Sequence, residues 1–461
     1  MVAAAEGRCR GRLRHSGAVT MSGPTIVETP IAGLLMVSLP VPADARGWFK
    51  ENWQREKMVA AGLPDFGPVQ QNVAFNPAAG TTRGIHAEPW DKLVSVATGR
   101  VFGAWVDLRA GDGFGTVFTM ELGPESAVFV PRGVGNAYQT LEDATSYIYL
   151  VNDHWSPGAA YVGLSPADPA LAVEWPIPLD RAVLSAKDLK SPPLSQVRPV
   201  APRRTLIVGA NGQVGRALRA VLPAAVAWGR DEFDVTDPAA YDDVDWRQYD
   251  AVINAAAYTA VDEAETDQGR RDAWRVNVHA TVNLARAALT HNLRLVHVSS
   301  DYVFDGSREE HQVDEPFSPL GVYGQTKAAA DAVVMVVPRH YIVRTSWVIG
   351  DGHNFIATMQ RLAREGVNPS VVDDQVGRLS HTEDIATRIV ELLDSGAPYG
   401  TYNVTSGGAP KSWYEIARDV FAAEGHDPDR VTPVSTAAYS AGKSLAPRPR
   451  FSTLAESGSA R

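Results

Sequence analysis

Two groups of residues in the sequence carry side chains that can move protons. The first lies in TRGIHAEPWDKLV, residues 82–94, where Arg83, His86 and Lys92 fall within ten residues in a region with almost no other histidine. The second is the pair Tyr323 and Lys327, which at four residues apart would share one face of a helix. Each group also has a structural interpretation, because a lone histidine often fills a core and a lone YxxxK is usually a helix surface. The surrounding sequence decides between the catalytic and the structural interpretation of each group.

A glycine-rich turn precedes the second group. In TLIVGANGQVGRAL a predicted strand passes into a predicted helix. Glycine lets the backbone turn tightly and approach a pyrophosphate, and the helix N-terminus offers amide donors to that phosphate. Such turns also occur for packing reasons, so the motif gains weight from its context. The predicted cofactor-binding residues of this turn are Gly209, Asn211, Gly212, Gln213, Val214 and Gly215.

That context comes from SSDYVFDG at 299–306 and YGQTK at 323–327, which follow in the order of a reductase site. Ser300 would hydrogen-bond the reacting carbonyl oxygen while Tyr323 protonates it. A phenol with its ordinary pKa of about 10 is a poor acid at neutral pH, but a lysine ammonium and the charge of a nicotinamide can lower that pKa. The sequence therefore predicts Ser300, Tyr323 and Lys327 as catalytic residues, with Tyr323 and Lys327 also contacting the cofactor.

The stretch AWGRDEFDVTD, which follows the second predicted strand of this half, indicates which cofactor is bound. Arg230 stands near the position expected for the ribose, where an arginine can pair with a 2′-phosphate and an acid would bind free hydroxyls. This favours NADPH and leaves NADH open. Asp234 is expected near the adenine, or in a structural role, rather than as the residue that selects the ribose.

The elements that would position these residues differ between the two halves. From about 25 to 165, short β-branched and aromatic runs such as SAVFVP and SYIYLVND alternate with turn residues, which predicts an antiparallel sandwich or jelly roll. From 204 on, strands such as DAVINAAA alternate with helical segments, the pattern of a doubly wound parallel sheet. The expected divisions are a tail at 1–22, an all-β domain at 23–188, a Pro-rich linker or strap at 189–203, an α/β domain with a small substrate-binding subdomain at 204–456, and a tail at 457–461.

Composition narrows the class of partner. A net charge of -10 over 461 residues argues against nucleic acid or an anionic membrane as the main partner. No apolar run reaches the roughly 18 to 20 residues needed to span a bilayer. The single cysteine, Cys9, excludes an internal disulfide framework and fits a reducing cytoplasm. The first residues lack a signal-peptide core, and a start at Met1 or at Met21 stays open.

The motifs GANGQVG, INAAAYTAVDEAE, VNVHAT, VSSDYVFDG, YGQTK, IVRTSWVIG, VVDDQVG and SWYEIA occur in one order over about 204–456. In this the second half resembles dTDP-4-dehydrorhamnose reductases of the extended short-chain dehydrogenase superfamily. The resemblance departs from the family at Leu379 and Ser380, where Pro-Thr is usual, and at Ser300, where threonine is usual. It implies that the cofactor lies along Asn254, Ala255, Ala256 and Tyr258, that Asn277 braces the catalytic region, and that the sugar nucleotide faces Asp301, Arg344, Trp347 and Asn354.

The first half carries DARGWFKENW, VQQN, RGIH, KLV, VPRG, YIY and DPALAVEWP in order over about 25–188. In this it resembles dTDP-4-dehydrorhamnose 3,5-epimerases, which are cupin-type jelly rolls without a catalytic metal. The resemblance implies that His86 is the base, that Asp168 orients it, that Tyr149 is the acid and that Lys92 stabilises an enolate or holds phosphate. The substrate-binding residues that it implies are Arg46, Glu51, Gln70, Asn72 and Arg83.

This half also departs from the family in its pocket. Ala87 and Glu88 replace an aromatic residue and glutamine, Asn136 replaces a histidine common in the family, and Trp155 stands where a second tyrosine is common. These changes predict an altered sugar preference or inversion at one centre only. A metal site is not expected, since metal cupins present paired histidines with a carboxylate and this half offers only His86 and His154.

Together the two resemblances predict a cytoplasmic bifunctional enzyme, a homodimer through its first half, that epimerises dTDP-4-dehydro-6-deoxyglucose at C3 and C5 and reduces C4 to dTDP-L-rhamnose or a close 6-deoxy-L-hexose. Two alternatives are a reductase whose cupin domain only assembles the dimer, and a non-catalytic nucleotide-binding regulatory subunit. The sequence leaves open the stereochemistry at C4, inversion at one or both centres, dTDP or UDP as carrier, and transfer of intermediates between sites.

Overall fold

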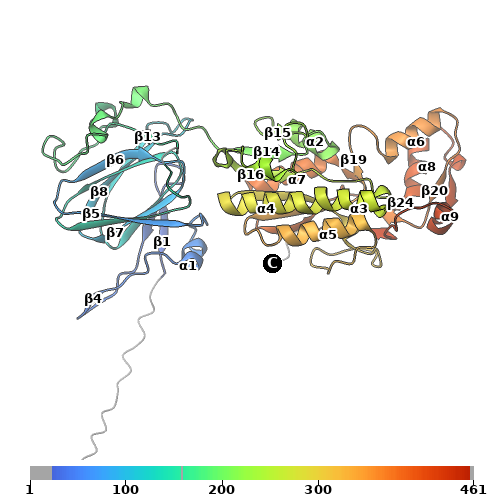
Figure 1. Ribbon diagram of the computed structural model, residues 1–461, viewed down its shortest axis with the longest axis horizontal. Coiled ribbons are helices and arrows are strands. Elements are labelled where there is room, and N and C mark those ends of the chain that lie inside the picture. Colours follow the sequence, from blue (N-terminus) through green and yellow to red (C-terminus); the bar gives the residue numbers. More distant parts are fainter. Residues whose placement is uncertain (1–22, 157–158, 457–461) are drawn as a thin grey trace, which may run out of the picture. The chain divides into compact units, whose positions relative to one another are not determined.

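The computed structural model describes residues 23–156 and 159–456, which form two compact units divided between Ala201 and Pro202. Figure 1 shows a β-rich first unit and a second unit of helices around a sheet. The predicted tails at 1–22 and 457–461, with Cys9 and Met21, lie outside the described residues. Among the described residues no helix is long and apolar enough to cross a membrane.

The first unit consists of two antiparallel sheets packed face to face. One sheet has the order β1-β2-β10-β7-β12-β5 and the other β13-β6-β11-β8-β9. A short hairpin and one helix complete the unit. The bounds are β1 Thr25–Glu28, β2 Leu35–Ser38, β3 Ala43–Asp44, β4 Gly47–Trp48, α1 Arg55–Ala60, β5 Gln70–Asn76, β6 Thr82–Ala87, β7 Lys92–Thr98, β8 Val101–Asp107, β9 Val117–Leu122, β10 Ser126–Val130, β11 Val134–Thr140, β12 Thr145–Val151 and β13 Val162–Gly163.

Strand alternation explains how the sheets stack. On β7, Val94 and Val96 point into the core between the sheets, whereas Leu93 points to a second cluster with Met58 of α1 and Phe66. The outer face of the second sheet is covered by the segment 164–197. This confirms the predicted jelly-roll class and shows that chain following the last strand folds back over β6.

The segment 189–203, predicted as a linker or strap, follows the first unit for most of its length. Val197 is buried in the cluster under the second sheet. Val200 exchanges backbone hydrogen bonds with Leu108 and Ala110, at 2.7 and 2.9 Å. The strap directly follows the segment 183–188, which contacts β6 through a hydrogen bond from the Thr82 backbone N–H to the Val183 carbonyl oxygen at 2.9 Å.

The second unit contains a six-stranded parallel sheet with the order β15-β14-β16-β17-β18-β23. Its core strands are β14 Arg204–Val208, β15 Val226–Trp228, β16 Tyr249–Asn254, β17 Arg294–Ser300, β18 His340–Thr345 and β23 Gly400–Asn403. Helices α4 and α5 contribute to the core on one face, and α2 and α7 to the core on the other. This doubly wound arrangement confirms the predicted α/β class and brings the strand ends of β14, β16 and β17 to one edge.

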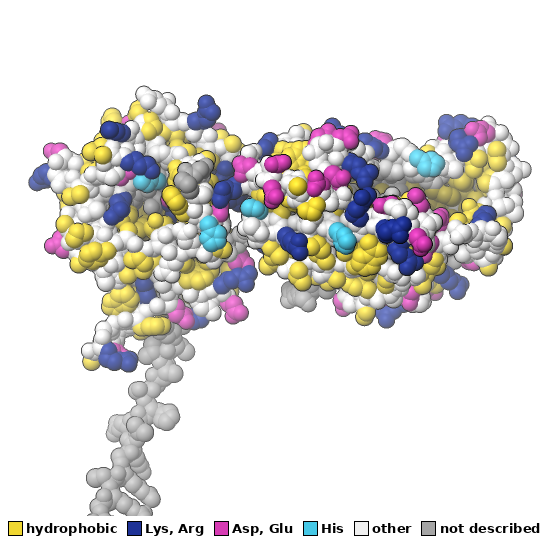
Figure 2. Space-filling view, in the orientation of Figure 1, with side chains coloured by type: hydrophobic (Ala, Val, Ile, Leu, Met, Phe, Trp, Pro, Cys, Tyr) yellow, Lys and Arg dark blue, Asp and Glu magenta, His cyan; other side chains and the backbone are white. Residues whose placement is uncertain are grey.

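The helices of this unit are α2 Gln213–Val221, α3 Asp267–Ala273, α4 Ala280–His291, α5 Val322–Val334, α6 Phe355–Arg364, α7 Thr382–Asp394, α8 Trp413–Ala423 and α9 Thr436–Ser440. A small subdomain packs α6 against α8 around Met359, Val420 and Phe421. Its short strands are β19 Val348–Ile349, β20 Ser370–Val372, β21 Val376–Gly377, β22 Ser380–His381, β24 Lys411–Ser412, β25 Thr432–Val434 and β26 Phe451–Ser452. On the face shown in Figure 2, basic and acidic side chains are interspersed on both units.

Candidate functional sites

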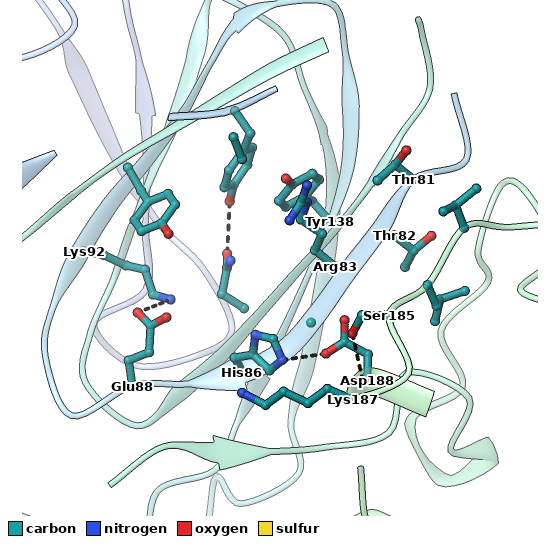
Figure 3. A pocket seen from close by; sticks show the side chains of 17 residues that line it. Thr81, Thr82, Arg83, His86, Glu88, Lys92, Tyr138, Ser185, Lys187 and Asp188 are labelled. Carbon is teal, nitrogen blue, oxygen red and sulfur yellow. Dashed lines mark hydrogen bonds and ion pairs between the residues drawn. The ribbon is translucent and has the colours of Figure 1, made fainter. Parts of the chain in front are cut away.

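The first unit encloses a cavity of about 450 Å³ whose walls carry most of its predicted proton-transfer residues (Figure 3). The walls come from β6, β7, β11 and β12 and from the segment 183–188. Gly84 allows β6 to approach β11 there, since it has a φ of +110° and a Cβ at this position would lie 2.5 Å from the carbonyl oxygen of Asn136. The cavity places His86, Lys92, Tyr149 and Arg83 together.

The His86 ring is hydrogen-bonded to Asp188, with Nε2 2.7 Å from Oδ1. Asp188 is almost fully buried and its backbone N–H donates to the Ser185 hydroxyl at 3.1 Å. A carboxylate on one ring nitrogen fixes the tautomer and leaves Nδ1 available as a base. His86 is thus held as a catalytic base would be.

The expected partner of His86, Asp168, is elsewhere, so that prediction is wrong. Asp168 caps the 3₁₀ turn Pro169–Leu171, accepting from the backbone N–H of Ala170 at 2.9 Å and of Leu194 at 2.6 Å. It therefore holds the strap at Leu194, six residues after Asp188. Sequence reasoning missed Asp188 because SAKDLK was assigned to the end of the domain on its Pro-rich and basic surroundings; the signal available was an acid in a stretch of basic residues.

Lys92 and Tyr149 lie on neighbouring strands beside His86. Lys92 Nζ pairs with Glu88 Oε2 at 2.8 Å, and both side chains are largely buried. Burial raises the pKa of Tyr149, Glu88 raises it further and Arg83 lowers it, with a net rise. Tyr149 is therefore a neutral proton donor at physiological pH.

A second layer of polar contacts lines the cavity. Arg83 Nε and the Tyr138 hydroxyl both donate to Asn76 Oδ1, at 3.1 and 3.3 Å. The Tyr147 hydroxyl donates to Oδ1 of Asn136 at 3.2 Å, so the residue that replaces a common histidine anchors a buried tyrosine. Tyr138 and Tyr147 stack with ring centroids 4.0 Å apart.

The other predicted substrate residues of this half do not line the cavity of the described chain. Arg46 pairs with Asp44 at the β3–β4 hairpin, and Glu51 pairs with Lys57 of α1. The side chain of Gln70 accepts from the backbone N–H of Trp155 at 3.1 Å and donates to the side-chain oxygen of Asn72 at 3.1 Å. The structure groups these four with the hairpin and with β5 rather than with His86.

In the second unit the glycine turn lies against the end of β16. Gly209 has a φ of +76°, and a Cβ there would lie 2.4 Å from the backbone nitrogen of Ala256. The adjoining Asn254, Ala255 and Gly212 complete a surface of backbone at the N-terminus of α2. This close backbone approach fits a dinucleotide pyrophosphate. The structure also places Asn211, Gln213, Val214 and Gly215 at this turn, as expected.

The charges near the expected ribose position also fit a phosphorylated cofactor. Burial raises the pKa of Asp234, but hydrogen bonds from Thr236 and the nearby guanidinium groups of Arg230 and Arg275 lower it below its ordinary value. Asp234 Oδ1 accepts from the Thr236 backbone N–H and hydroxyl, at 2.9 and 2.8 Å. Asp234 therefore has a structural role in bonding Thr236. A second arginine, Arg275, lies near it together with Arg230.

Ser300 ends β17 and Tyr323 and Lys327 share one face of α5, as predicted. Burial raises the pKa of Tyr323 to about 12, against the lowering effect of a hydrogen bond with Ser300. Burial lowers the pKa of Lys327 to about 8. The expected lowering of the tyrosine pKa by Lys327 is thus not seen in the protein alone: Lys327 Nζ bonds the Val298 carbonyl oxygen at 2.8 Å and lies 3.2 Å from His297 Nε2.

Two residues brace this centre. Asn277, on the π-helical turn Trp274–His279, donates to the Thr326 hydroxyl at 2.9 Å and accepts from the backbone N–H of Tyr258 at 2.8 Å. Tyr258 thus sits beside the catalytic helix α5. Asp301, predicted to face substrate, is buried next to Ser300, and burial raises its pKa to about 7.

The sugar-nucleotide positions predicted further along are structural. Arg344 is 1% exposed and pairs with Asp331 at 3.0 Å in the core, so its predicted contact with substrate is wrong. Asn354 caps α6 by accepting from the Ala357 backbone N–H at 2.9 Å. Trp347 stacks on Trp413, with ring centroids 3.7 Å apart.

A second cavity, of about 540 Å³, lies in the small subdomain. Its walls include Phe355, Trp413, Tyr439, Asp262 and Arg448. Arg448 pairs with Asp262 at 2.9 Å and lies 6.0 Å over the Tyr302 ring, which meets the Tyr323 ring edge to face at 5.6 Å. These contacts lead from the cavity to the reductase centre. The sequence analysis did not predict the walls of this cavity. The one wall residue that falls in a motif quoted there is Trp413, in SWYEIA, and it stacks on Trp347.

Among the described residues no group of three or more His, Cys, Asp or Glu side chains is arranged to hold a metal ion.

Two families match the chain. The RmlD substrate binding domain matches residues 203–460, and the dTDP-4-dehydrorhamnose 3,5-epimerase family matches residues 28–196. A protein named RmlC homolog from Streptococcus pyogenes serotype M6 is 47% identical over 182 residues, 38% of this chain and 90% of its own. A dTDP-4-dehydrorhamnose reductase of Mycobacterium tuberculosis H37Rv is 40% identical over 267 residues, 54% of this chain and 84% of its own.

Among solved structures, a dTDP-4-dehydrorhamnose reductase from Bacillus anthracis in complex with NADP is similar to the second unit. It is 33% identical, covers 56% of this chain and 91% of its own, and has a TM-score of 0.51. A second reductase, from Clostridium acetobutylicum, is 35% identical over 55% of this chain and 90% of its own, also with a TM-score of 0.51.

Proposed function

The chain belongs to the dTDP-4-dehydrorhamnose 3,5-epimerase family in its first unit and to the RmlD substrate-binding family in its second, and from this premise we propose how its two sites work together. The protein is a bifunctional enzyme of dTDP-rhamnose synthesis that epimerises dTDP-4-dehydro-6-deoxyglucose and reduces the C4 ketone with NADPH. The observation that carries the proposal is that one chain holds His86 paired with Asp188 beside Tyr149 and Lys92, and also Ser300, Tyr323 and Lys327 beside a glycine turn.

In the first unit, epimerisation proceeds by proton transfer next to the C4 carbonyl. His86 takes the proton from the carbon beside the ketone, and the C–H electron pair moves onto the C4 oxygen as an enolate. The Lys92 ammonium stabilises that oxygen, and Asp188 stabilises the imidazolium. Tyr149 then gives its proton to the opposite face of the carbon as the C4 carbonyl re-forms. Solvent returns a proton to the Tyr149 phenolate, and His86 releases its proton to solvent.

In the second unit, bound NADPH supplies the hydride to C4. The glycine turn with Gly209 and Gly215 would hold its pyrophosphate, and Arg230 would pair with its 2′-phosphate. Tyr323 protonates the C4 oxygen, Ser300 hydrogen-bonds that oxygen, and Lys327 would hold the adjoining ribose. The cavity beside Trp413 and Arg448 receives the sugar nucleotide.

We also propose a homodimer through the first unit, with a dTDP-sugar rather than nucleic acid as the ligand, working in the cytoplasm. Support for the dimer comes from apolar side chains that are exposed in a single chain: Trp48 and Phe49 near the hairpin, and Val73 and Phe75 on the edge strand β5. Light scattering of the eluting peak in size-exclusion chromatography would give twice the chain mass. A Val73→Lys, Phe75→Lys variant at single-chain mass would support this interface, and a monomeric parent would contradict it.

The function is tested by NMR in deuterated water with dTDP-4-dehydro-6-deoxyglucose, first without cofactor and then with NADPH. Deuterium should enter at C3 and C5 without cofactor in the parent and in Tyr323→Phe, but not in His86→Ala. NADPH should then be consumed by the parent and not by Tyr323→Phe. A parent that exchanges no deuterium, and that reduces only after a separate epimerase is added, would leave the first unit as an assembly domain.

A further inference from the structure

Glu88 is an acidic side chain in the epimerase cavity that none of the proposed steps uses. It follows His86 by two residues, directly after the end of β6, and the side chains of both residues line the same cavity. Its Oε2 lies 2.8 Å from Lys92 Nζ and accepts a hydrogen bond from Trp90 Nε1 at 2.8 Å. One carboxylate oxygen therefore holds both groups (Figure 3 shows the pair with Lys92).

The loop between Glu88 and Lys92 is fixed at several points. The Trp90 ring is buried and meets the Tyr161 ring edge to face at 5.5 Å. Asp91 accepts from the Arg132 backbone N–H at 2.8 Å and from the side chain of Asn152 at 3.0 Å. Such a loop does not let the Glu88 carboxylate turn out to solvent, so the pair with Lys92 is a built feature of the cavity.

The charges around this pair make Glu88 an anion. Lys92 is 4% exposed, and burying a charge is costly unless the charge is paired. Burial raises the pKa of Glu88, but Lys92, Trp90 and His86 together bring it below its ordinary value. The same carboxylate raises the pKa of Tyr149, after the larger effect of burial. Glu88 thus acts on both the Lys92 ammonium and the Tyr149 phenol.

The ionisable groups around Tyr149 come from every wall of the cavity. Arg83, His86 and Glu88 come from β6 and the loop after it, Lys92 from β7, and Tyr138 and Tyr147 from β11 and β12. Lys187 and Asp188 come from the segment 183–188. Of the charged groups that act on Tyr149, Glu88 favours the phenol and Arg83 favours the phenolate.

We propose that Glu88 is a positioning residue of the epimerase: it directs the Lys92 ammonium at the enolate oxygen and presents its negative charge in the cavity that Tyr149 also lines. This rests on the proposed epimerase function. One N–H group of the Lys92 ammonium donates a hydrogen bond to Glu88, and the other N–H groups are left for the C4 oxygen. Without the carboxylate, Lys92 has no fixed partner and Tyr149 loses a neighbour that disfavours its anion.

The sharpest variant is Glu88→Gln, because the amide oxygen can still accept from Trp90 and from Lys92 while the charge is removed. Deuterium incorporation at C3 and C5 should fall at least about tenfold at neutral pH, as expected when electrostatic support of a developing oxyanion is weakened. The alkaline limb of the pH–rate profile, where the acid must stay protonated, should move to lower pH by about half a unit or more. Glu88→Asp, which restores the charge, should recover part of both.

Two controls separate this role from a merely structural one. Glu142→Gln removes an exposed acid of the same unit and should change neither rate nor profile. In a Lys92→Gln background, Glu88→Gln should add much less than tenfold, because the two residues act as a unit. An unshifted alkaline limb, or equal effects of Glu88→Gln with and without Lys92, would overturn the positioning role. A parent without any exchange would overturn the proposed function itself.

Discussion

Asp188 and Asp168 are two carboxylates whose contacts assign them different roles. Asp188 bonds the His86 ring, whereas Asp168 accepts from the backbone N–H groups of Ala170 and Leu194. Asp188→Asn should therefore lower deuterium exchange by about 100-fold or more, because general-base catalysis loses its partner. Asp168→Asn should keep exchange within about threefold and lower stability by about 1 kcal/mol, because an amide NH2 replaces one of the two oxygens that accept from backbone N–H groups.

The measurement is proton exchange by NMR together with thermal unfolding of both variants. Equal loss of exchange in the two, at equal stability, would contradict the assignment. NADPH oxidation with an already epimerised ketone serves as the control, since neither residue lies in the second unit.

Asp301 makes a prediction about stability and pH. Burial raises its pKa to about 7, above the ordinary value of 3.8. Between those values the folded protein binds a proton that the unfolded chain does not, so this group's contribution to stability falls as pH rises from about 4 to 7 and then stays low. Asp301→Asn removes the titration. The gain in Tm of Asp301→Asn over the parent should be larger at pH 8 than at pH 5, and a gain independent of pH would contradict this.

At the scale of elements, α8 presents its first residue, Trp413, to the cavity of the small subdomain. The helix begins with a capping box between Ser412 and Glu415, which fixes the orientation of that first turn. Trp413 stacks on Trp347 and lies near Phe355. An aromatic wall of this kind suits a flat base or sugar face.

Trp413→Ala should raise the KM for the sugar nucleotide by about tenfold, because a stacking surface is lost, and leave the KM for NADPH unchanged. The matched control is Tyr414→Ala, the next residue of α8, which is outside the cavity walls and contacts Arg418. Steady-state kinetics with each substrate varied in turn measures both. An equal rise in both KM values would indicate a general loss of structure.

Elements were also what the sequence predicted well. Period-two runs such as SYIYLVND and strand–helix alternation after 204 report local patterns, and both sheets formed as expected. The contacts that failed are long-range. Asp188 reaches His86 across 102 residues from a stretch whose composition resembles a linker. In the sequence, Arg344 is a charged residue near the end of a predicted strand, which suggests an exposed position. In the structure it is buried in the core, where it pairs with Asp331 of α5.

At the scale of the whole molecule, the two centres lie in separate compact units with separate cavities. The linker tethers the two units to each other but does not hold a ketone that one unit has released into solvent. Tethering alone therefore does not raise the concentration of that ketone at the other site. The two activities should therefore be separable by point changes. His86→Ala and Tyr323→Phe should each fail to form the epimerised, reduced product alone.

Mixed at equal site concentrations, these two variants should form product with a lag equal to that of the parent within about twofold, because in both cases the intermediate crosses through solvent. NADPH oxidation followed by stopped flow, with NMR of the product, measures the lag. A parent lag that is much shorter, and that stays constant on tenfold dilution while the lag of the mixture lengthens, would show direct transfer. That result would require the two units to hold a defined arrangement during turnover, whereas equal lags leave each unit as an enzyme in its own right.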